Sequence, residues 1–201
     1  CILAQNVFTQ WTVQHSDTNY NLTNINFIDE NTGIAAGYSL VPFTNQAKGV
    51  IYRTSNAGAN WVIVFLDTSL LVYTTEFMDN QNWFAGGAYY STQPKLLKST
   101  NAGINWFYIS HGEITHGIHS LDYYSSVAYA VTNGGCFRST NGGLNWSAGF
   151  GAFSLSPDGF FINSLTGWCG FDEGNIFKTT NGGDTWVLFP QGVENIQARK
   201  I

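Results

Sequence analysis

The sequence predicts an all-β protein built from repeated four-stranded antiparallel sheets. Three observations support this fold class: one turn motif occurs four times, its copies follow one another at a nearly constant distance, and the chain is rich in small and aromatic residues. The tryptophans at positions 11, 61, 106, 146 and 186 are 50, 45, 40 and 40 residues apart. A repeat of this length accommodates four short strands. The 201 residues include 22 Gly, 10 Tyr and 15 Phe, a composition that suits short strands, tight turns and aromatic packing.

The turn motif consists of a basic residue, Ser or Thr, any residue, Asn, a small residue, Gly, two variable residues and Trp. It occupies residues 53–61, 98–106, 138–146 and 178–186, each time between two short apolar runs, and therefore predicts a β-hairpin. We expect the Asn side chain to accept hydrogen bonds from backbone N–H groups one or two residues further along. The Gly is expected to take a positive φ. The hydroxyl should tie the strand end to the turn, and the Trp ring should cover the turn.

The residues expected in these roles are Thr54, Asn56, Gly58 and Trp61 in the first copy, Ser99, Asn101, Gly103 and Trp106 in the second, Ser139, Asn141, Gly143 and Trp146 in the third, and Thr179, Asn181, Gly183 and Trp186 in the fourth.

This motif resembles the Asp-box, or BNR repeat, with Asn at the usual Asp position. In proteins that carry the repeat, the hairpin joins the third and fourth strands of a β-propeller blade. The resemblance covers almost the whole chain and implies a β-propeller of four-stranded antiparallel blades. In this interpretation the boxes are structural turns on the face away from the ligand, and the alternative is that the boxes themselves form a repeated ligand site.

The rest of each repeat fits the same scheme. An innermost strand with alternating large residues, such as 25–29, precedes a strand rich in Ala and Gly, such as 33–37. The repeats are placed at about 20–66, 67–110, 111–150 and 151–190, all within a propeller segment that spans 5–201.

Both ends of the chain carry partial strands in this interpretation. Residues 10–14 read as an outer strand that no box precedes, and residues 193–197 as the start of a further innermost strand, so that 191–201 begin another blade or form a tail. The prediction is therefore four full repeats plus partial strands, forming part of a larger propeller or an open one. Closure of a small ring by the N-terminal strand is the alternative.

The composition and net charge of the chain limit the kinds of molecule that it is expected to bind. Charged residues make up 10% of the chain, against a usual value of about 25%, and the formal net charge is −5. Phosphate binding needs clustered Lys and Arg, so nucleic acid is not expected as a partner. No apolar run reaches the length of a transmembrane helix.

The first residues, Cys-Ile-Leu-Ala-Gln, have the character of the end of a secretory signal, with small Ala4 before the cleavage point. Residues 1–4 are interpreted as this remnant, which predicts a secreted, periplasmic or cell-surface protein. A lipid-anchored Cys1 and a chain that begins within a longer sequence are the alternatives. Cys136 and Cys169 are expected on neighbouring blades, where they form either a disulfide or two small buried side chains.

Two long loops are expected on the face opposite the boxes. Residues 38–49 include Tyr38 and Phe43, and residues 88–95 include Tyr89 and Tyr90. Loops that are longer than a hairpin needs and rich in aromatic residues often bind ligands. These aromatic residues are therefore candidate ligand contacts, and the alternative is that they pack within their own loops.

A third candidate segment holds three of the four histidines. His111, Glu113, His116 and His119 lie within nine residues. Imidazole and carboxylate groups bind transition metals, and His titrates near neutral pH. The spacing matches no metal-binding signature, so no metal is predicted. A solvated loop with one His entering the core and a pH-sensitive or metal-assisted ligand contact both remain open.

Catalytic residues are not predicted. Sialidases carry Asp-boxes and bind a carboxylate with three arginines, beside a Tyr–Glu nucleophile pair and an acid. In this chain only Arg199 lies outside the repeated motif. Paired carboxylates also lack candidates, because Asp29, Asp79 and Asn163 occupy one repeat position and are expected to be turn residues.

The repeated phrasing is similar to that of photosystem II assembly-factor-like propellers. Residues 179–186 carry this likeness together with Phe161, Ile162, Asn163 and Gly167. These proteins are extracytoplasmic assembly factors, and the photosynthetic members are expected to present an arginine-rich surface that this chain lacks. The resemblance implies the fold and a binding role.

Taken together, these patterns predict an exported, non-catalytic propeller that binds a protein or a glycan through the loops opposite the box turns. No cofactor is predicted. The first alternative is part of an Asp-box, sialidase-like glycoside hydrolase whose catalytic residues lie outside this segment. The second is a purely architectural spacer.

Overall fold

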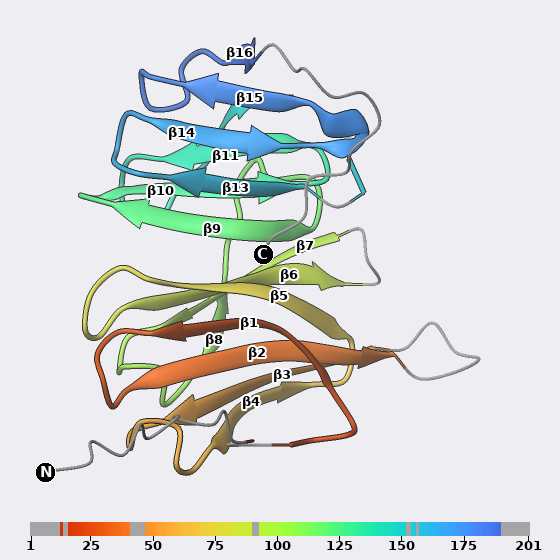
Figure 1. The fold of residues 1–201 in the computed structure, drawn as a ribbon, viewed down its shortest axis with the longest axis vertical. Helices are drawn as coiled ribbons and strands as arrows, with labels where there is room; N and C mark the ends of the chain where they lie inside the picture. Colours follow the sequence, from red (N-terminus) through yellow and green to blue (C-terminus); the bar gives the residue numbers. More distant parts are fainter. Residues whose placement is uncertain are drawn as a thin grey trace, which may run out of the picture.

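A computed structural model describes residues 13, 16–40, 47–89, 93–151, 154–155 and 157–189 of the chain. Within these ranges the protein is all-β, with four antiparallel four-stranded sheets that follow one another in the chain (Figure 1). This confirms the predicted fold class. Each sheet is called a blade, numbered 1 to 4. Apart from the short turn η1 (Asp172–Gly174), the described residues contain no helix, and none that could cross a membrane.

The strands are β1 (Asn21–Phe27), β2 (Gly33–Leu40), β3 (Ala47–Thr54) and β4 (Val62–Asp67) in blade 1, β5 (Leu70–Phe77), β6 (Trp83–Tyr89), β7 (Gln93–Ser99) and β8 (Phe107–Ile109) in blade 2, β9 (Ile118–Tyr124), β10 (Val127–Thr132), β11 (Gly135–Ser139) and β12 (Ser147–Phe150) in blade 3, and β13 (Asp158–Phe161), β14 (Gly167–Gly170), β15 (Ile176–Thr179) and β16 (Val187–Phe189) in blade 4.

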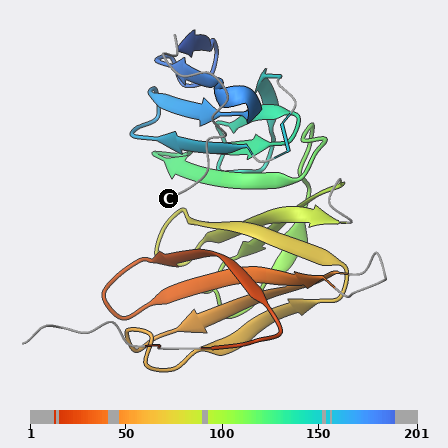
Figure 2. The ribbon, with the colours of Figure 1, turned by 45° about the vertical axis from the view of Figure 1, so that its right-hand side comes forward.

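The blades stack face to face in chain order. The inner strands β5, β9 and β13 each pack against the blade before them: β5 on β1 to β3, β9 on β5 to β7, and β13 on β9 and β10. In both views of the molecule, blades 1 and 4 lie at opposite ends of the stack (Figures 1 and 2). The four described blades therefore form an open stack, and do not close into a ring among themselves.

The box turns have one hydrogen-bond pattern in all four copies. The Ser or Thr hydroxyl donates to the Asn Oδ1 and accepts from the Gly N–H at 2.9 to 3.0 Å. The Asn Oδ1 also accepts from the backbone N–H four residues further along, at 2.9 to 3.0 Å. The prediction that the Asn side chain accepts from N–H groups one or two residues further along was wrong. Two consecutive left-handed residues follow the Asn, and they bring the chain back toward its side chain.

Those left-handed residues explain the small residue and the Gly of the motif. The first has φ of 57°, 54°, 68° and 71° at Ala57, Ala102, Gly142 and Gly182. The second is Gly in every copy, with φ between 75° and 89°, as predicted. The Trp ring completes the turn in two copies, where Nε1 of Trp106 donates to the oxygen of Gly103 and Nε1 of Trp146 to that of Gly143.

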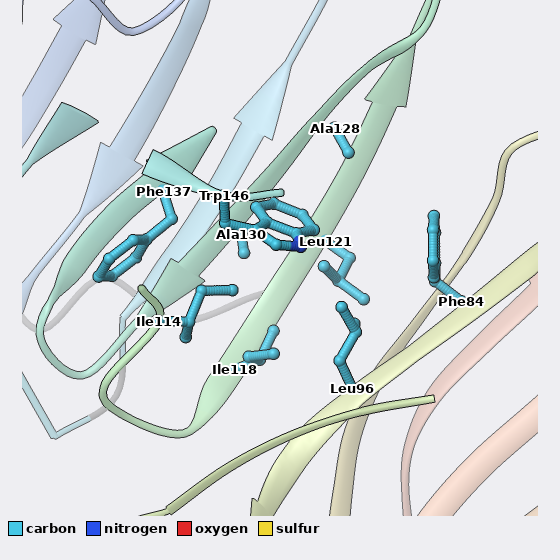
Figure 3. Close-up of a cluster of buried hydrophobic side chains, with 9 residues drawn as sticks. All are labelled: Phe84, Leu96, Ile114, Ile118, Leu121, Ala128, Ala130, Phe137 and Trp146. Carbon is cyan, nitrogen blue, oxygen red and sulfur yellow. The ribbon is translucent and has the colours of Figure 1, made fainter. Parts of the chain in front are cut away.

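Each blade turns one face, called here the forward face, toward the next blade. In blade 2 this face carries Phe84 and Leu96, which pack against Ile118 and Leu121 of β9 (Figure 3). All four side chains are buried. Burial of one such side chain contributes about 1.5 to 3 kcal/mol, so these contacts hold the stack together.

The box turns also join neighbouring blades. A Cβ atom on Gly143, in the box of blade 3, would lie 2.5 Å from Cζ of Phe84 in blade 2, so this Gly is needed for close approach as well as for its φ. Two of the basic residues before a box, Arg53 and Arg138, reach the box of the following blade. Nε of Arg53 donates to the oxygen of Ala102 at 2.7 Å, and Arg138 forms an ion pair with Asp184 at 2.6 Å. These arginines therefore belong to the joints between blades.

The cysteines of neighbouring blades meet in the core. Cys136 of β11 and Cys169 of β14 are free, buried and packed in one cluster with Val131 and Phe171. Burial, together with the adjacent Cys136 thiol, raises the pKa of the Cys169 thiol well above its ordinary value. Of the two arrangements left open by the sequence, the structure contains the pair of small buried side chains.

The double role of the box glycine gives a first prediction. Gly143→Ala and Gly58→Ala each place a Cβ at a φ above 80°, which costs about 1 to 2 kcal/mol. Only Gly143→Ala also clashes with Phe84, since the added Cβ of Gly58→Ala finds its nearest neighbour, Nε1 of Trp61, at 3.5 Å. We expect Gly143→Ala to lower the free energy of unfolding by about 1 to 3 kcal/mol more than Gly58→Ala, measured by chemical denaturation. Equal losses would show that the box does not support the joint between blades.

Candidate binding site

The two ends of the sheets differ in their connections. One end carries the box turns and the hairpins that join β1 to β2 and β5 to β6, and lies on the left in Figure 1. The opposite end, called here the loop rim, carries the links from β2 to β3 and from β6 to β7, and those from each outer strand to the next inner strand. The candidate site is built where the inner strands begin, at the loop rim.

Three inner strands carry a β-bulge close to this rim. The pairing with the second strand skips Thr23 in β1, Tyr73 in β5 and His119 in β9. A bulge inserts one unpaired residue and redirects its side chain, and bulges are common next to functional sites. The bulged residues occupy equivalent positions in three blades, so their side chains can meet across the stack.

Two of these bulged residues form the centre of a line of side chains, called here the aromatic row. The rings of Tyr73 and His119 are stacked, with centroids 4.5 Å apart and an interplanar angle of 17°. Tyr38, near the end of β2, meets Tyr73 edge to face at 5.6 Å. At the other end, Nε2 of His119 lies 3.0 Å from Oδ1 of Asn133, and Nδ2 of Asn133 donates to the oxygen of Ser154 at 2.8 Å. The row thus crosses from blade 1 to the segment that leads into blade 4.

Burial determines the protonation states of Tyr73 and His119 in the row. It raises the pKa of Tyr73 to about 12, with a smaller contribution from Tyr38. It lowers the pKa of His119, although the hydrogen bond to Asn133 and the charge of Asp158 act in the opposite direction. His119 is therefore neutral at pH 7. Because the Asn133 amide nitrogen donates elsewhere, its oxygen accepts from His119, and the proton of the imidazole is on Nε2.

The inner strands also line a groove of about 580 Å³, called here the inner groove. Three carboxylates contributed by three blades, those of Glu76, Asp122 and Asp158, contribute to its wall. Hydrogen bonds made by lining residues join two successive inner strands, β9 and β13. Oδ2 of Asp122 accepts from the N–H of Phe161 at 3.0 Å, and the Ser120 hydroxyl donates to the next blade at 3.0 Å. The groove is polar and negatively charged, which favours cationic groups in a ligand.

The structure separates the predicted ligand residues into groups. Tyr38 and His119 meet at Tyr73 in the aromatic row. Tyr89 lies at the end of β6, where the ammonium group of Lys95 sits 5.8 Å from its ring and 5.7 Å from that of Tyr108. The predictions for Phe43 and Tyr90 fall outside the described residues.

The remaining residues of the histidine segment lie apart from the row. Nδ1 of His111 is 3.0 Å from the oxygen of Ile114 in its own loop, and Nδ1 of His116 is 2.8 Å from the hydroxyl of the preceding Thr. Glu113 is exposed. Among the described residues, no three His, Cys, Asp or Glu side chains are placed to hold a metal ion.

Sequence reasoning missed Tyr73 and Asn133. Tyr73 lies in a short stretch that carries no turn signal, and its importance comes from a bulge. A partial signal was available, because Thr23, Tyr73 and His119 each directly follow a large apolar residue of an inner strand. The groove carboxylates were missed for a related reason, since each one belongs to a different blade.

Comparison with known proteins identifies the architecture. No family model and no curated protein sequence matches the chain. Solved structures do match. The structure of YCF48 bound to D1 peptide is 16% identical with a TM-score of 0.51, over 85% of this chain and 81% of that one. YCF48 from Cyanidioschyzon merolae is 15% identical with a TM-score of 0.52, over 86% of this chain and 70% of that one.

A glycoside hydrolase of family GH74 from Niastella koreensis matches as well. It is 18% identical with a TM-score of 0.51, over 73% of this chain but only 28% of the enzyme. The chain has the β-propeller fold. Binding proteins and enzymes are both found among its structural neighbours, so the fold by itself does not distinguish between these functions.

The buried imidazole gives a prediction for the pH dependence of stability. Burial lowers the folded-state pKa of His119 below its ordinary value of 6.5. As the pH falls through that value, the unfolded chain binds a proton that the folded protein does not, so the folded state loses stability. We expect His119→Phe to show a smaller loss of unfolding free energy between pH 7 and pH 5 than the unaltered protein. His116→Asn is the control, because its ring lies outside the row. Equal pH dependence in all three proteins would contradict the assigned burial.

Proposed function

We propose that this propeller is a non-catalytic binding module that holds a segment of a partner protein at the loop rim, on the aromatic row and at the mouth of the inner groove. The observation that carries the proposal is the row itself. Tyr38, Tyr73, His119 and Asn133 form an ordered line across three blades at a position where the strands are bulged. An ordered polar and aromatic line spanning several elements is the kind of surface that anchors a ligand.

The arrangement of the rings favours a protein segment over a glycan. Sugar rings stack on free aromatic faces. One face of Tyr73 is already covered by His119, and the edge contact with Tyr38 occupies more of the ring. The hydroxyls of Tyr38 and Tyr73 have no hydrogen-bond partner among the residues that the structure describes, so the row presents polar groups suited to a peptide backbone.

The negative charge of the inner groove and the similarity to the YCF48 fold also support a peptide ligand. Glu76, Asp122 and Asp158 favour a segment with basic side chains in the inner groove. A propeller of similar fold, YCF48, is described as bound to a D1 peptide, so peptide binding is a use that this architecture serves.

Removal of two hydroxyls tests the proposed contact. We expect Tyr38→Phe/Tyr73→Phe to weaken binding of the strongest hit from a library of extended peptides about tenfold. Each lost hydrogen bond contributes about 0.5 to 1.5 kcal/mol, and the rings that stabilise the fold are retained. The dissociation constant can be measured by isothermal titration calorimetry.

Tyr108→Phe is the matched control for this experiment. The hydroxyl of Tyr108 donates to Oδ2 of Asp67 at 2.7 Å, away from the row. The control should bind as the unaltered protein does. If a parallel glycan array gives the stronger hits, or if the double variant binds peptides normally, the proposal is wrong.

The second candidate function is glycan hydrolysis, and a specific observation favours it. Three carboxylates line one groove, and carboxylates are the acids, bases and nucleophiles of glycosidases. Under this alternative, a fluorogenic sialoside or glucoside should be turned over, and both Glu76→Gln and Asp158→Asn should abolish turnover. No turnover by the unaltered chain across a panel of such substrates would exclude this activity for the segment.

We also propose that the protein acts outside the cytoplasm, because its first residues have the apolar character of an export signal. Detection of the protein in the cytoplasmic fraction alone would refute this part of the proposal.

A further inference from the structure

The two ends of the stack carry apolar faces that no described blade covers. Blade 1 exposes its rear face, the face directed away from blade 2, and blade 4 exposes its forward face, at the opposite end (Figures 1 and 2). On blade 1, Ile25 and Phe27 are exposed by 60% and 44%. On blade 4, Ile162 is 52% exposed and Trp168 is partly exposed. Apolar faces of this kind mark interaction surfaces.

The rear face of blade 1 contains an apolar pocket of about 270 Å³, called here the end pocket. Phe27 of the inner strand, Ala35 of the second strand, and Gly58 and Trp61 of the box all line it. The same four positions exist in every other blade. Matched by sheet register and by place in the box, they hold Phe77, Ala85, Gly103 and Trp106 in blade 2, Tyr123, Ala130, Gly143 and Trp146 in blade 3, and Phe161, Cys169, Gly183 and Trp186 in blade 4.

In blades 3 and 4 these positions receive one side chain from the forward face of the preceding blade. Tyr129 of blade 3 stacks on Phe161 of blade 4 with ring centroids 3.6 Å apart, and its Cε1 would lie 3.7 Å from a Cβ on Gly183. Phe84 of blade 2 lies in one buried cluster with Trp146 of blade 3 (Figure 3).

The joint between blades 1 and 2 is built in the same way. Ile34 of blade 1 belongs to the buried cluster that contains Ala85 of blade 2, and Trp106 packs against that cluster. The three inserted side chains, those of Ile34, Phe84 and Tyr129, are exposed by 0%, 1% and 2%. Each joint therefore consists of a forward side chain inserted into the rear pocket of the next blade.

Trp168 is the corresponding forward side chain of blade 4. It pairs with Lys178 across the sheet, as Phe84 pairs with Lys98. The Lys178 ammonium lies 5.1 Å from the Trp168 ring, and that of Lys98 lies 5.5 Å from the Phe84 ring. Blade 4 thus holds Trp168 in the arrangement of a completed joint. The molecule carries one forward side chain without a described pocket at one end, and one pocket without a described occupant at the other.

We propose that a second copy of this chain covers both end faces, with Trp168 of each copy inserted into the end pocket of the other. The contact repeats an interface that the chain already makes three times within itself, so the two faces are complementary by construction. Because the faces differ, the contact is heterologous, and it either closes into a ring or extends into a filament.

The number of blades favours a ring of two copies. Four described blades in each copy give eight, which lies within the usual propeller range of about four to eight blades, whereas three copies would give twelve. The inference is independent of the proposed function, since it concerns the end faces of the stack and the aromatic row lies at the loop rim.

Sedimentation velocity of the full 201-residue chain tests the proposal, because it separates monomers, two-copy rings and longer assemblies. We expect a two-copy particle that does not grow as the concentration is raised. Ile162→Asp places a charge on the forward face, at the position of Ile28 and Met78, which pack against the clusters of the joints that follow their blades. Ile25→Asp places a charge at the end pocket. Each variant breaks both contacts of the ring, and should weaken the dimer roughly a hundredfold.

Mixing the two variants identifies the contact as head-to-tail. The mixture contains one unaltered forward face and one unaltered rear face, so it should form a one-to-one pair through a single joint, although neither variant associates alone. Recovery of this pair also shows that both variants are folded. A contact between two like faces would instead leave one of the variants dimeric by itself, and would overturn the proposal.

Val62→Asp is the matched control. Val62 is 58% exposed although blade 2 covers the forward face of blade 1, so this outer-strand position lies outside the joints. The control should sediment as the unaltered chain does. The proposal is overturned if the unaltered chain is monomeric at concentrations up to about 100 μM, if it assembles beyond two copies, or if Val62→Asp weakens the dimer as much as Ile25→Asp.

Discussion

Close contact between each box turn and the blade before it is the constraint on which the rest of this propeller depends. The hydroxyl–Asn network holds two successive residues left-handed, the second of them always Gly. In blades 3 and 4 this Gly approaches the forward face of the preceding blade: a Cβ at Gly143 would lie 2.5 Å from Cζ of Phe84, and one at Gly183 would lie 3.7 Å from Cε1 of Tyr129. A local turn motif therefore sets the distance between sheets that are about 40 residues apart in sequence. The arginine that precedes a box strengthens the same joint, since Arg53 reaches the turn of blade 2.

The inner surface depends on this spacing. Once the sheets are held at a fixed separation, polar side chains of one inner strand reach the backbone of the next: Nδ2 of Asn26 donates to the oxygen of Thr75 at 2.6 Å, and the Ser120 hydroxyl donates to the oxygen of Gly159 at 3.0 Å. Residues displaced by bulges can then stack across blades, as Tyr73 and His119 do. The row and the inner groove are properties of the stack, because no single blade contains enough of either to bind a ligand.

The box turns are local, whereas the aromatic row and the inner groove are assembled from several blades. This difference explains which features could be predicted from the sequence. Box turns are local, and their chemistry is written in nine consecutive residues, so the repeat, the blade and the positive φ of each Gly were all predictable. The reach of the Asn side chain was underestimated, because it depends on two left-handed residues in succession. Tyr73 was overlooked because its direction is set by a bulge whose position becomes clear only when three inner strands are superimposed. The groove carboxylates, such as Asp122, come from separate blades, and only the stacking order brings them together. The grouping of His111, His116 and His119 was a feature of the sequence alone, since the structure gives each a different partner.

A site that is assembled from several blades couples binding to the stability of the stack. A ligand that touches blades 1 to 3 at once binds only when their joints are formed, so its binding energy adds to the energy that holds the blades together. The two end blades differ in how far the described residues cover their outer apolar side chains. At blade 1, Tyr52 is 2% exposed although no described blade precedes it, because Tyr20 and Trp61 pack over it and its hydroxyl donates to Asp17. At blade 4 the described residues provide no such cover for Phe160. The aromatic row lies on blades 1 to 3, so a ligand bound to the row depends on the joints among these three blades.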